Sequence, residues 1–211
     1  MISRLILARH GNTFNPTDKP FWVGAGSDLP LVEKGMAQAQ ALADAMKKAN
    51  IVPTALLTGP LQRTRRTAEI VAQTLNLSAD AIRIDTRLTE IDYGVWEGKS
   101  TEEIEALGGG AELAAWDKNA IFPTSPGWQP TEAQIIAHTQ EIVSEAVSGT
   151  SLIVTSNGIL RFFARLAVNA TDYPDRKVAT GRICVMEQDQ AGGWHIRQWN
   201  QSPDILYSVE A

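Results

Sequence analysis

The sequence predicts an α/β protein, a three-layer α/β/α sandwich with a mostly parallel central sheet and a C-terminal hairpin. Short apolar segments alternate with longer segments of helical periodicity over most of the 211 residues, a pattern typical of a sheet covered by helices on both faces. Near the end of the chain, residues 182–188 and 194–199 flank Ala191-Gly192-Gly193, a hairpin signal. No repeat, linker or shift in composition divides the chain, so we expect one domain over residues 1–211.

Short apolar segments predict the strands of the parallel part of the sheet. They are residues 4–8, 55–57, 82–84 and 151–154. Short, mostly apolar runs of this kind are expected where both faces of a sheet are covered. Residues 10–30, which repeatedly carry Gly, Asn, Pro and Asp, are predicted to form a loop after the first strand.

Amphipathic segments predict the helices that cover the sheet. They are residues 32–48, 59–75, 131–147 and 157–168. Pro60 suits the first helical position, where its missing N–H costs nothing, and Thr131 is a suitable N-cap. The glycines at 108–110 and the proline-rich stretch 123–130 interrupt regular structure. Between them we expect a short helical piece around residues 112–116.

Charge and composition exclude several classes of protein. The chain has 19 Lys and Arg against 24 Asp and Glu, a net charge of −5, whereas nucleic-acid binders normally carry a basic excess. A single cysteine, Cys184, excludes a disulfide framework. With histidines only at positions 10, 138 and 195, we expect no metal and no cofactor. No apolar run suits a signal peptide or approaches the about 18 residues of a membrane span. We therefore expect a cytoplasmic protein with a reduced cysteine.

Three polar turns follow predicted strands and are expected to meet at one edge of the sheet. They are residues 9–13, 58–63 and 155–158. Ligands of open α/β sheets bind outside the carboxyl ends of the strands. Arg9 and Arg63 offer planar charged donors to a phosphate, and the helix starts after Pro60 and Asn157 offer free N–H groups. His10 is placed to attack phosphorus if a backbone carbonyl orients its other ring nitrogen.

A set of sequence segments matches a known signature in order and approximate spacing. The segments are Arg9-His10-Gly11, 28–35 (DLPLVEKG), 59–68 (GPLQRTRRTA), 88–98 (LTEIDYGVWEG) and 156–161 (SNGILR). Together they resemble the histidine phosphatase superfamily, which includes the phosphoglycerate mutases and many small-molecule phosphatases. The match extends over nearly the whole chain and is far more specific than the tripeptide alone.

The resemblance implies roles for the matching residues. His10 would be the nucleophile that becomes phosphohistidine, and Glu90 the general acid that protonates the leaving oxygen and later activates water. Arg9 and Arg63 would hold the phosphoryl oxygens. The other predicted phosphate contacts are Asn12, Thr13, Ser156 and Asn157. Positioning and charge stabilisation suffice for such a transfer, without a metal.

One position departs from the family pattern. Ser156 stands where the resemblance places a second active-site histidine, which donates to the phosphoryl group. Ser156 or Asn157 can still supply a neutral donor, and losing one transition-state donor typically costs about 10² to 10³ in rate. We therefore expect slowed or retuned catalysis rather than none.

The expected function is hydrolysis of a small phosphorylated metabolite through a phosphohistidine at His10. One alternative is phosphoglycerate mutase-like phosphoryl transfer; the family's mutases carry a longer segment before the late turn, so hydrolysis is favoured. The other is a catalytically weak or silent phosphate-binding or scaffold protein, because the second histidine is missing. The expected partner is a small phosphorylated substrate, not nucleic acid or a membrane. The oligomeric state stays open, with a homodimer as one option.

Several other residues have structural interpretations. Arg65 and Arg66 are expected to face solvent or acidic neighbours, and Arg161 and Arg165, one helical turn apart, to be candidates for surface ion pairs. The remaining histidines, His138 and His195, are expected to be structural. Among the tryptophans, those in loops, at positions 22 and 128, are candidates to line a substrate pocket.

Overall fold

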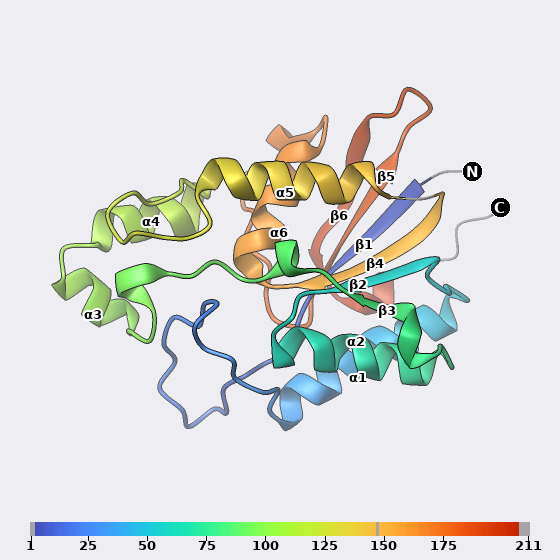
Figure 1. The fold of residues 1–211 in the computed structure, drawn as a ribbon, viewed down its shortest axis with the longest axis horizontal. Helices are drawn as coiled ribbons and strands as arrows, with labels where there is room; N and C mark the ends of the chain where they lie inside the picture. Colours follow the sequence, from blue (N-terminus) through green and yellow to red (C-terminus); the bar gives the residue numbers. More distant parts are fainter. Residues whose placement is uncertain (1–2, 147, 207–211) are drawn as a thin grey trace.

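The computed structural model describes residues 3–146 and 148–206, which form a six-stranded sheet with helices on both faces (Figure 1). The strands are β1 (Ser3–Arg9), β2 (Ala55–Thr58), β3 (Ile82–Ile84), β4 (Gly149–Thr155), β5 (Ile183–Gln188) and β6 (Trp194–Gln201). Their order is β3-β2-β4-β1-β5-β6. The first four in this order are parallel, and β5 pairs antiparallel with both β1 and β6. The predicted mostly parallel sheet with a C-terminal hairpin is confirmed.

Two pairs of helices make the outer layers (Figure 1). They are α1 (Glu33–Lys48) with α2 (Gln62–Thr74), and α5 (Glu132–Ser144) with α6 (Asn157–Phe163). Strand β1 shows how the layers are built, because alternate side chains of a strand point to opposite faces. Ile6 packs in the apolar cluster of α1 and α2 with Leu42, while Leu7 packs in the opposite cluster with Ile135. Each face therefore buries its own apolar core.

The predicted helix starts are correct in one case and wrong in another. Thr131 caps α5 in a capping box with Gln134, as its side chain suggests; the predicted end of this helix, Val147, lies outside the described residues. Pro60 does not begin α2, which starts at Gln62. The carboxylate of Asp28 accepts the Gln62 N–H at 2.7 Å, so a distant loop caps this helix. Local sequence preference does not reveal such a cap.

A separate helical segment lies beyond the carboxyl edge of the sheet, away from the chain ends (Figure 1). It contains α3 (Thr101–Ala106) and α4 (Gly110–Asn119). Helix α4 corresponds to the predicted helical piece, whereas α3 was not predicted, although Ser100 and Glu103 form a capping box at its start. Trp116 on α4 and Trp96, just before α3, both make ring contacts with the buried Trp128, at centroid distances of 5.0 and 5.3 Å.

Candidate active site

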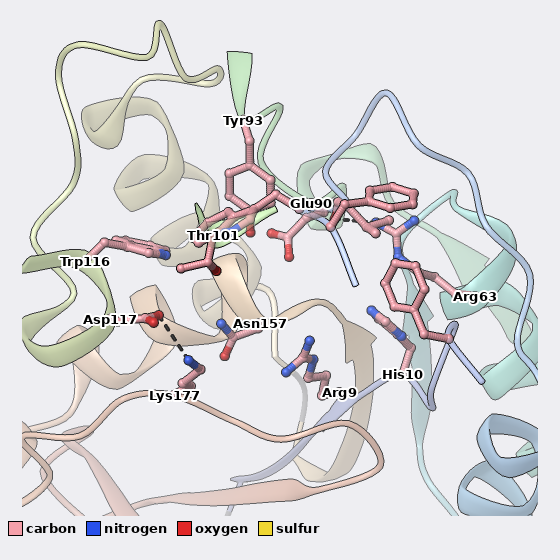
Figure 2. A pocket seen from close by; sticks show the side chains of 14 residues that line it. Arg9, His10, Arg63, Glu90, Tyr93, Thr101, Trp116, Asp117, Asn157 and Lys177 are labelled. Carbon is pink, nitrogen blue, oxygen red and sulfur yellow. Dashed lines mark hydrogen bonds and ion pairs between the residues drawn. The ribbon is translucent and has the colours of Figure 1, made fainter. Parts of the chain in front are cut away.

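An open cleft of about 240 Å³ lies at the carboxyl ends of β1 and β4 (Figure 2). Its lining residues come from the turns after the strands, the loop after β1, the α3–α4 segment and the loop before β5. They are Arg9, His10, Phe14, Phe21, Trp22, Val23, Arg63, Glu90, Tyr93, Thr101, Trp116, Asp117, Asn157 and Lys177. The sheet therefore brings together the three turns that the sequence predicts to meet, as expected for an open α/β sheet.

His10 follows β1 directly and is held in one orientation. Its N–H donates to Thr155 O at 3.1 Å, and its Nδ1 lies 2.7 Å from Gly11 O. Because a carbonyl only accepts, Nδ1 carries the proton and Nε2 keeps its lone pair. Burial, and then the charges of Arg9 and Arg63, lower the His10 pKa well below its ordinary value. The imidazole is therefore neutral at neutral pH, with a nucleophilic nitrogen free of the Gly11 contact.

The turn after His10 packs directly against the start of α1. Gly11 and Gly35 touch through their backbones, and a Cβ at either position would overlap the other segment. Val32 N–H also donates to Asn12 O at 3.1 Å. Glycine is required here for close approach, which explains the glycine that ends the 28–35 motif.

Hydrogen bonds to backbone carbonyl oxygens hold the guanidinium groups of Arg9 and Arg63 in place. Arg9 Nη1 donates to Val178 O at 2.6 Å. Arg63 donates through Nη1 to Ser27 O at 2.6 Å and through Nη2 to Gly24 O at 3.1 Å. Burial lowers the pKa of both guanidinium groups, and the charge of Glu90 opposes that shift. Both arginines stay charged at neutral pH, so the cleft holds two fixed positive charges beside His10.

Glu90 points into the cleft with its carboxylate held by two backbone donors (Figure 2). It is 4% exposed, and its oxygens accept from Ile91 N at 2.9 Å and from Gly158 N at 3.2 Å. Burial, together with the Glu90 charge, raises the pKa of Tyr93 well above its ordinary value, so Tyr93 is a neutral phenol. The cleft thus combines a neutral imidazole, two guanidinium groups and a carboxyl group. The carboxyl group can exchange a proton with a bound ligand.

The remaining predicted phosphate contacts are not all in this cleft. Asn157 lines it, whereas Asn12 and Thr13 line a neighbouring cavity with Thr180. The Asn12 side chain accepts a hydrogen bond from the Thr180 hydroxyl. Ser156 is 1% exposed and is not among the described lining residues; its Oγ has no hydrogen-bond partner within residues 3–146 and 148–206. Of these four residues, only Asn157 therefore lines the cleft that contains His10.

Arg161 forms an ion pair, as considered, with its Nη2 3.5 Å from Asp117 Oδ1, but its side chain is buried rather than at the surface. It is 1% exposed, its guanidinium lies 4.5 Å from the centroid of the Trp116 ring, and Nη1 donates to Trp116 O. The loss of water lowers its pKa. Arg165 also forms the expected ion pair, with Glu132 at 2.6 Å. The two arginines differ because Arg161 lies on α6 and is buried, whereas Arg165 lies in the turn after α6 and is partly exposed.

The aromatic and charged wall of the cleft contains residues that sequence reasoning missed. Trp22 lines the cleft as considered, but Trp128 is 3% exposed in the aromatic cluster and is not among the described lining residues. Asp117 and Lys177 come from segments that match no motif and form an ion pair of 3.1 Å on one side of the cleft (Figure 2). No signal in the sequence would have paired these two residues, because their segments meet only in the folded chain.

The described residues offer neither a metal site nor a membrane-spanning helix. They contain no group of three or more His, Cys, Asp or Glu side chains arranged to hold a metal ion. Within the same residues, every helix is too short or too polar to cross a membrane.

The fold and the cleft define a class of protein: an α/β sandwich with a cationic, histidine-centred cavity at the carboxyl edge of its sheet. Residues 5–202 match the sequence model of the histidine phosphatase superfamily (branch 1). The chain belongs to this family.

Similar proteins include both mutases and phosphatases. The chain is 38% identical over 205 residues to the Proteus mirabilis protein named "Probable phosphoglycerate mutase GpmB", covering 93% of this chain and 89% of that protein. A 2,3-bisphosphoglycerate-dependent phosphoglycerate mutase of Bifidobacterium longum is 31% identical over 125 residues, 58% of this chain. The match spans only 49% of that mutase's length.

Solved structures share the fold. A mycobacterial glucosyl-3-phosphoglycerate phosphatase superposes with a TM-score of 0.76 at 24% identity, covering 95% of this chain and 99% of that one. The alpha-ribazole phosphatase of Shigella flexneri gives a TM-score of 0.72 at 23% identity, covering 99% of this chain and 100% of that one. Because both sequence identities are below 25%, these comparisons establish the fold alone.

Proposed function

We propose that this protein hydrolyses phosphomonoesters of small metabolites through a phosphohistidine at His10. The observation that carries the proposal is the state of His10: a neutral imidazole with Nδ1 bound to the Gly11 carbonyl at 2.7 Å, in a cleft shared with Arg9, Arg63 and Glu90. A histidine held in this tautomer presents Nε2 as the nucleophile.

In the first half-reaction, the Nε2 lone pair of His10 attacks phosphorus. The N–P bond forms as the bond from phosphorus to the ester oxygen breaks, and the acid form of Glu90, which the second half-reaction regenerates, gives its proton to that leaving oxygen. The positive charge that develops on the imidazole is stabilised by the Nδ1–H bond to Gly11 O. Arg9 and Arg63 balance the charge of the phosphoryl oxygens during the transfer.

In the second half-reaction, water attacks the phosphohistidine. The Glu90 carboxylate accepts a proton from the water as the new P–O bond forms and the N–P bond breaks. Inorganic phosphate leaves, and His10 returns to its neutral state. The cleft of about 240 Å³ suits a small substrate, and the rings of Phe14, Phe21 and Trp22 offer apolar contacts to its non-phosphate part.

The relationship to mutases favours one alternative, transfer of the phosphoryl group back to a hydroxyl of the same metabolite. The Proteus mirabilis relative carries a mutase name and aligns with 93% of this chain. The two activities differ in product: hydrolysis releases inorganic phosphate in proportion to the substrate consumed, while mutase activity yields a phosphate isomer and little free phosphate.

Ser156 favours another alternative, a protein that binds phosphate without turnover. Its hydroxyl is buried, and none of the described residues partners it. A serine is neutral, so it supplies less charge stabilisation to a phosphoryl group than a protonated histidine does. A protein of this kind would bind phosphate and form no phosphohistidine.

Trapping the phosphoenzyme tests the proposed function. The protein is mixed with p-nitrophenyl phosphate, quenched within milliseconds at alkaline pH, digested and mapped by mass spectrometry. We expect acid-labile phosphate on the peptide that contains His10, and none on the peptides of His138 and His195, which serve as internal controls. Absence of label, together with no turnover of a panel of small phosphomonoesters, would refute the proposal.

Replacing Gly158 with alanine is expected to impair catalysis by moving Glu90. A Cβ at this position would overlap Glu90 Oε1 and lie 2.9 Å from Ile91 Cδ1. Misplacing a catalytic group by about 1 Å can reduce turnover on the order of 10²-fold. The measurement is kcat for p-nitrophenyl phosphate, with thermal unfolding to verify the fold.

Gly110→Ala is the matched control for this substitution. A Cβ at Gly110 would make only ordinary contacts with Glu105, at 3.5 Å and beyond, so turnover should stay at the native level. Native turnover in Gly158→Ala would show that the exact place of the Glu90 carboxylate is unimportant.

A further inference from the structure

The backbone next to Lys177 is hydrogen-bonded to two residues that line the cleft, Arg9 and Asn157. Its neighbour Val178 donates its N–H to Asn157 Oδ1 at 2.8 Å and accepts from Arg9 Nη1 at 2.6 Å. The N–H of Lys177 itself donates to Asp175 Oδ1 at 2.9 Å. Figure 2 shows Lys177 on the same side of the cleft as Arg9 and Asn157. The segment therefore places a lysine beside the proposed phosphate site.

The ammonium group of Lys177 is bound in a way that lets it exchange partners. Nζ lies 3.1 Å from Asp117 Oδ1, and the two side chains are 51% and 43% exposed. Exposed ion pairs of this kind contribute little to stability. Arg161 Nη2 lies 3.5 Å from the same carboxylate oxygen. Asp117 would thus keep a cationic partner if Lys177 moved away.

Lys177 differs from the two arginines that line the cleft. Arg9 and Arg63 donate to backbone carbonyls and are fixed, whereas the four-carbon side chain of a lysine can rotate toward a ligand. These three are the Lys and Arg side chains among the described lining residues. Ser156, beside Asn157, is buried and adds no charge on that side. Lys177 is therefore the cationic side chain that can move to contact an anion on that side of the cleft.

We propose that Lys177 is a phosphate-binding residue, whose ammonium group leaves Asp117 and donates to a phosphoryl oxygen on the Asn157 side of the cleft. The inference rests on the proposed function for the place of the phosphoryl group. Asp117 holds the lysine at the cleft before the anion enters and keeps its contact with Arg161 afterwards. A dianionic phosphate offers the ammonium more negative charge than the single carboxylate does.

Calorimetric titration with inorganic phosphate tests this role without requiring turnover. At constant low ionic strength, we expect Lys177→Ala to weaken phosphate affinity by about 10- to 100-fold, the effect of one charge-assisted hydrogen bond. Lys177→Arg should retain most of the affinity. Asp117→Asn should bind phosphate more tightly, because its amide competes less well for the lysine. The exposed Lys118 on α4 provides the matched control: Lys118→Ala changes the net charge equally and should bind like the native protein.

The outcomes separate this inference from the proposed function. Equal phosphate affinity in Lys177→Ala and the native protein would overturn the role of Lys177, as would the absence of phosphate binding by the native protein. Weaker binding by Asp117→Asn would overturn the exchange of partners. Labelled His10 with unchanged phosphate affinity in Lys177→Ala would support the function and reject the inference. Weakened affinity without any phosphohistidine would support the inference and reject the function.

Discussion

Replacing His10 with alanine is expected to lower turnover of phosphomonoesters by more than about 10³-fold, because it removes the nucleophile on which both half-reactions depend. Arg9 and Arg63 are fixed by backbone carbonyls rather than by His10. The variant should therefore still bind inorganic phosphate, and the loss should appear in kcat. Steady-state kinetics and calorimetric titration with phosphate measure the two effects separately.

The other two histidines provide controls for the His10 variant. His195 is part of the C-terminal hairpin and lies 2.8 Å from Asp189, and His138 is half-buried on α5. Neither lines the cleft among the described residues, so His138→Ala and His195→Ala should keep native turnover. Substantial turnover in His10→Ala would be incompatible with a phosphohistidine intermediate at this residue.

Glu90→Gln is expected to lower turnover of alkyl phosphates by about 10² to 10⁴, the usual contribution of a general acid or base. An amide cannot protonate the alkoxide leaving group, nor can it accept a proton from water. The formation of phosphohistidine from p-nitrophenyl phosphate should suffer less, because nitrophenolate leaves readily without a proton. Its hydrolysis should remain slow, so the phosphoenzyme is expected to accumulate.

Rapid-quench kinetics with both substrates measure this difference. The exposed Glu105 on α3 supplies the control, since Glu105→Gln makes the same change in a side chain that is not among the described lining residues. Glutamine at position 90 also faces two backbone N–H donors, from Ile91 and Gly158, so thermal unfolding should be compared in parallel. An equal loss of turnover for alkyl and nitrophenyl phosphates would argue against proton transfer to the leaving group by Glu90.

Much of the fold was predictable because its signals are local. The apolar runs at 4–8 and 151–154 became β1 and β4, and the Gly-rich turn at 191–193 became the turn of a hairpin. The prediction was wrong where a contact with a residue far away in the sequence decides where an element begins. Helix α2 starts after Pro60 because Asp28 caps it. Helix α3 has a capping box in its sequence but buries little beyond Ile104, and so lacks a strong apolar period.

The site was predictable to the extent that strand ends define it. Arg9 ends β1 and His10 follows it, and Arg63 and Asn157 come after the ends of β2 and β4, so the order of parallel strands brings them together. Lys177 follows no strand and matches no motif. Its place depends on the contacts of the loop before β5 with Arg9 and Asn157, which no periodicity or spacing can indicate.

The sequence alone determined the α/β class, the family resemblance and the choice of His10 as the candidate nucleophile. These depend on the alternation of short apolar runs with amphipathic segments and on ordered motifs, all readable along the chain. Only the tertiary structure decided that His10 is neutral, with its Nδ1–H donating a hydrogen bond to Gly11 O. Its lowered pKa results from burial and from the charges of Arg9 and of Arg63, which lies on α2. Burial and electrostatic interaction depend on distances in space, which exist only once the chain has folded.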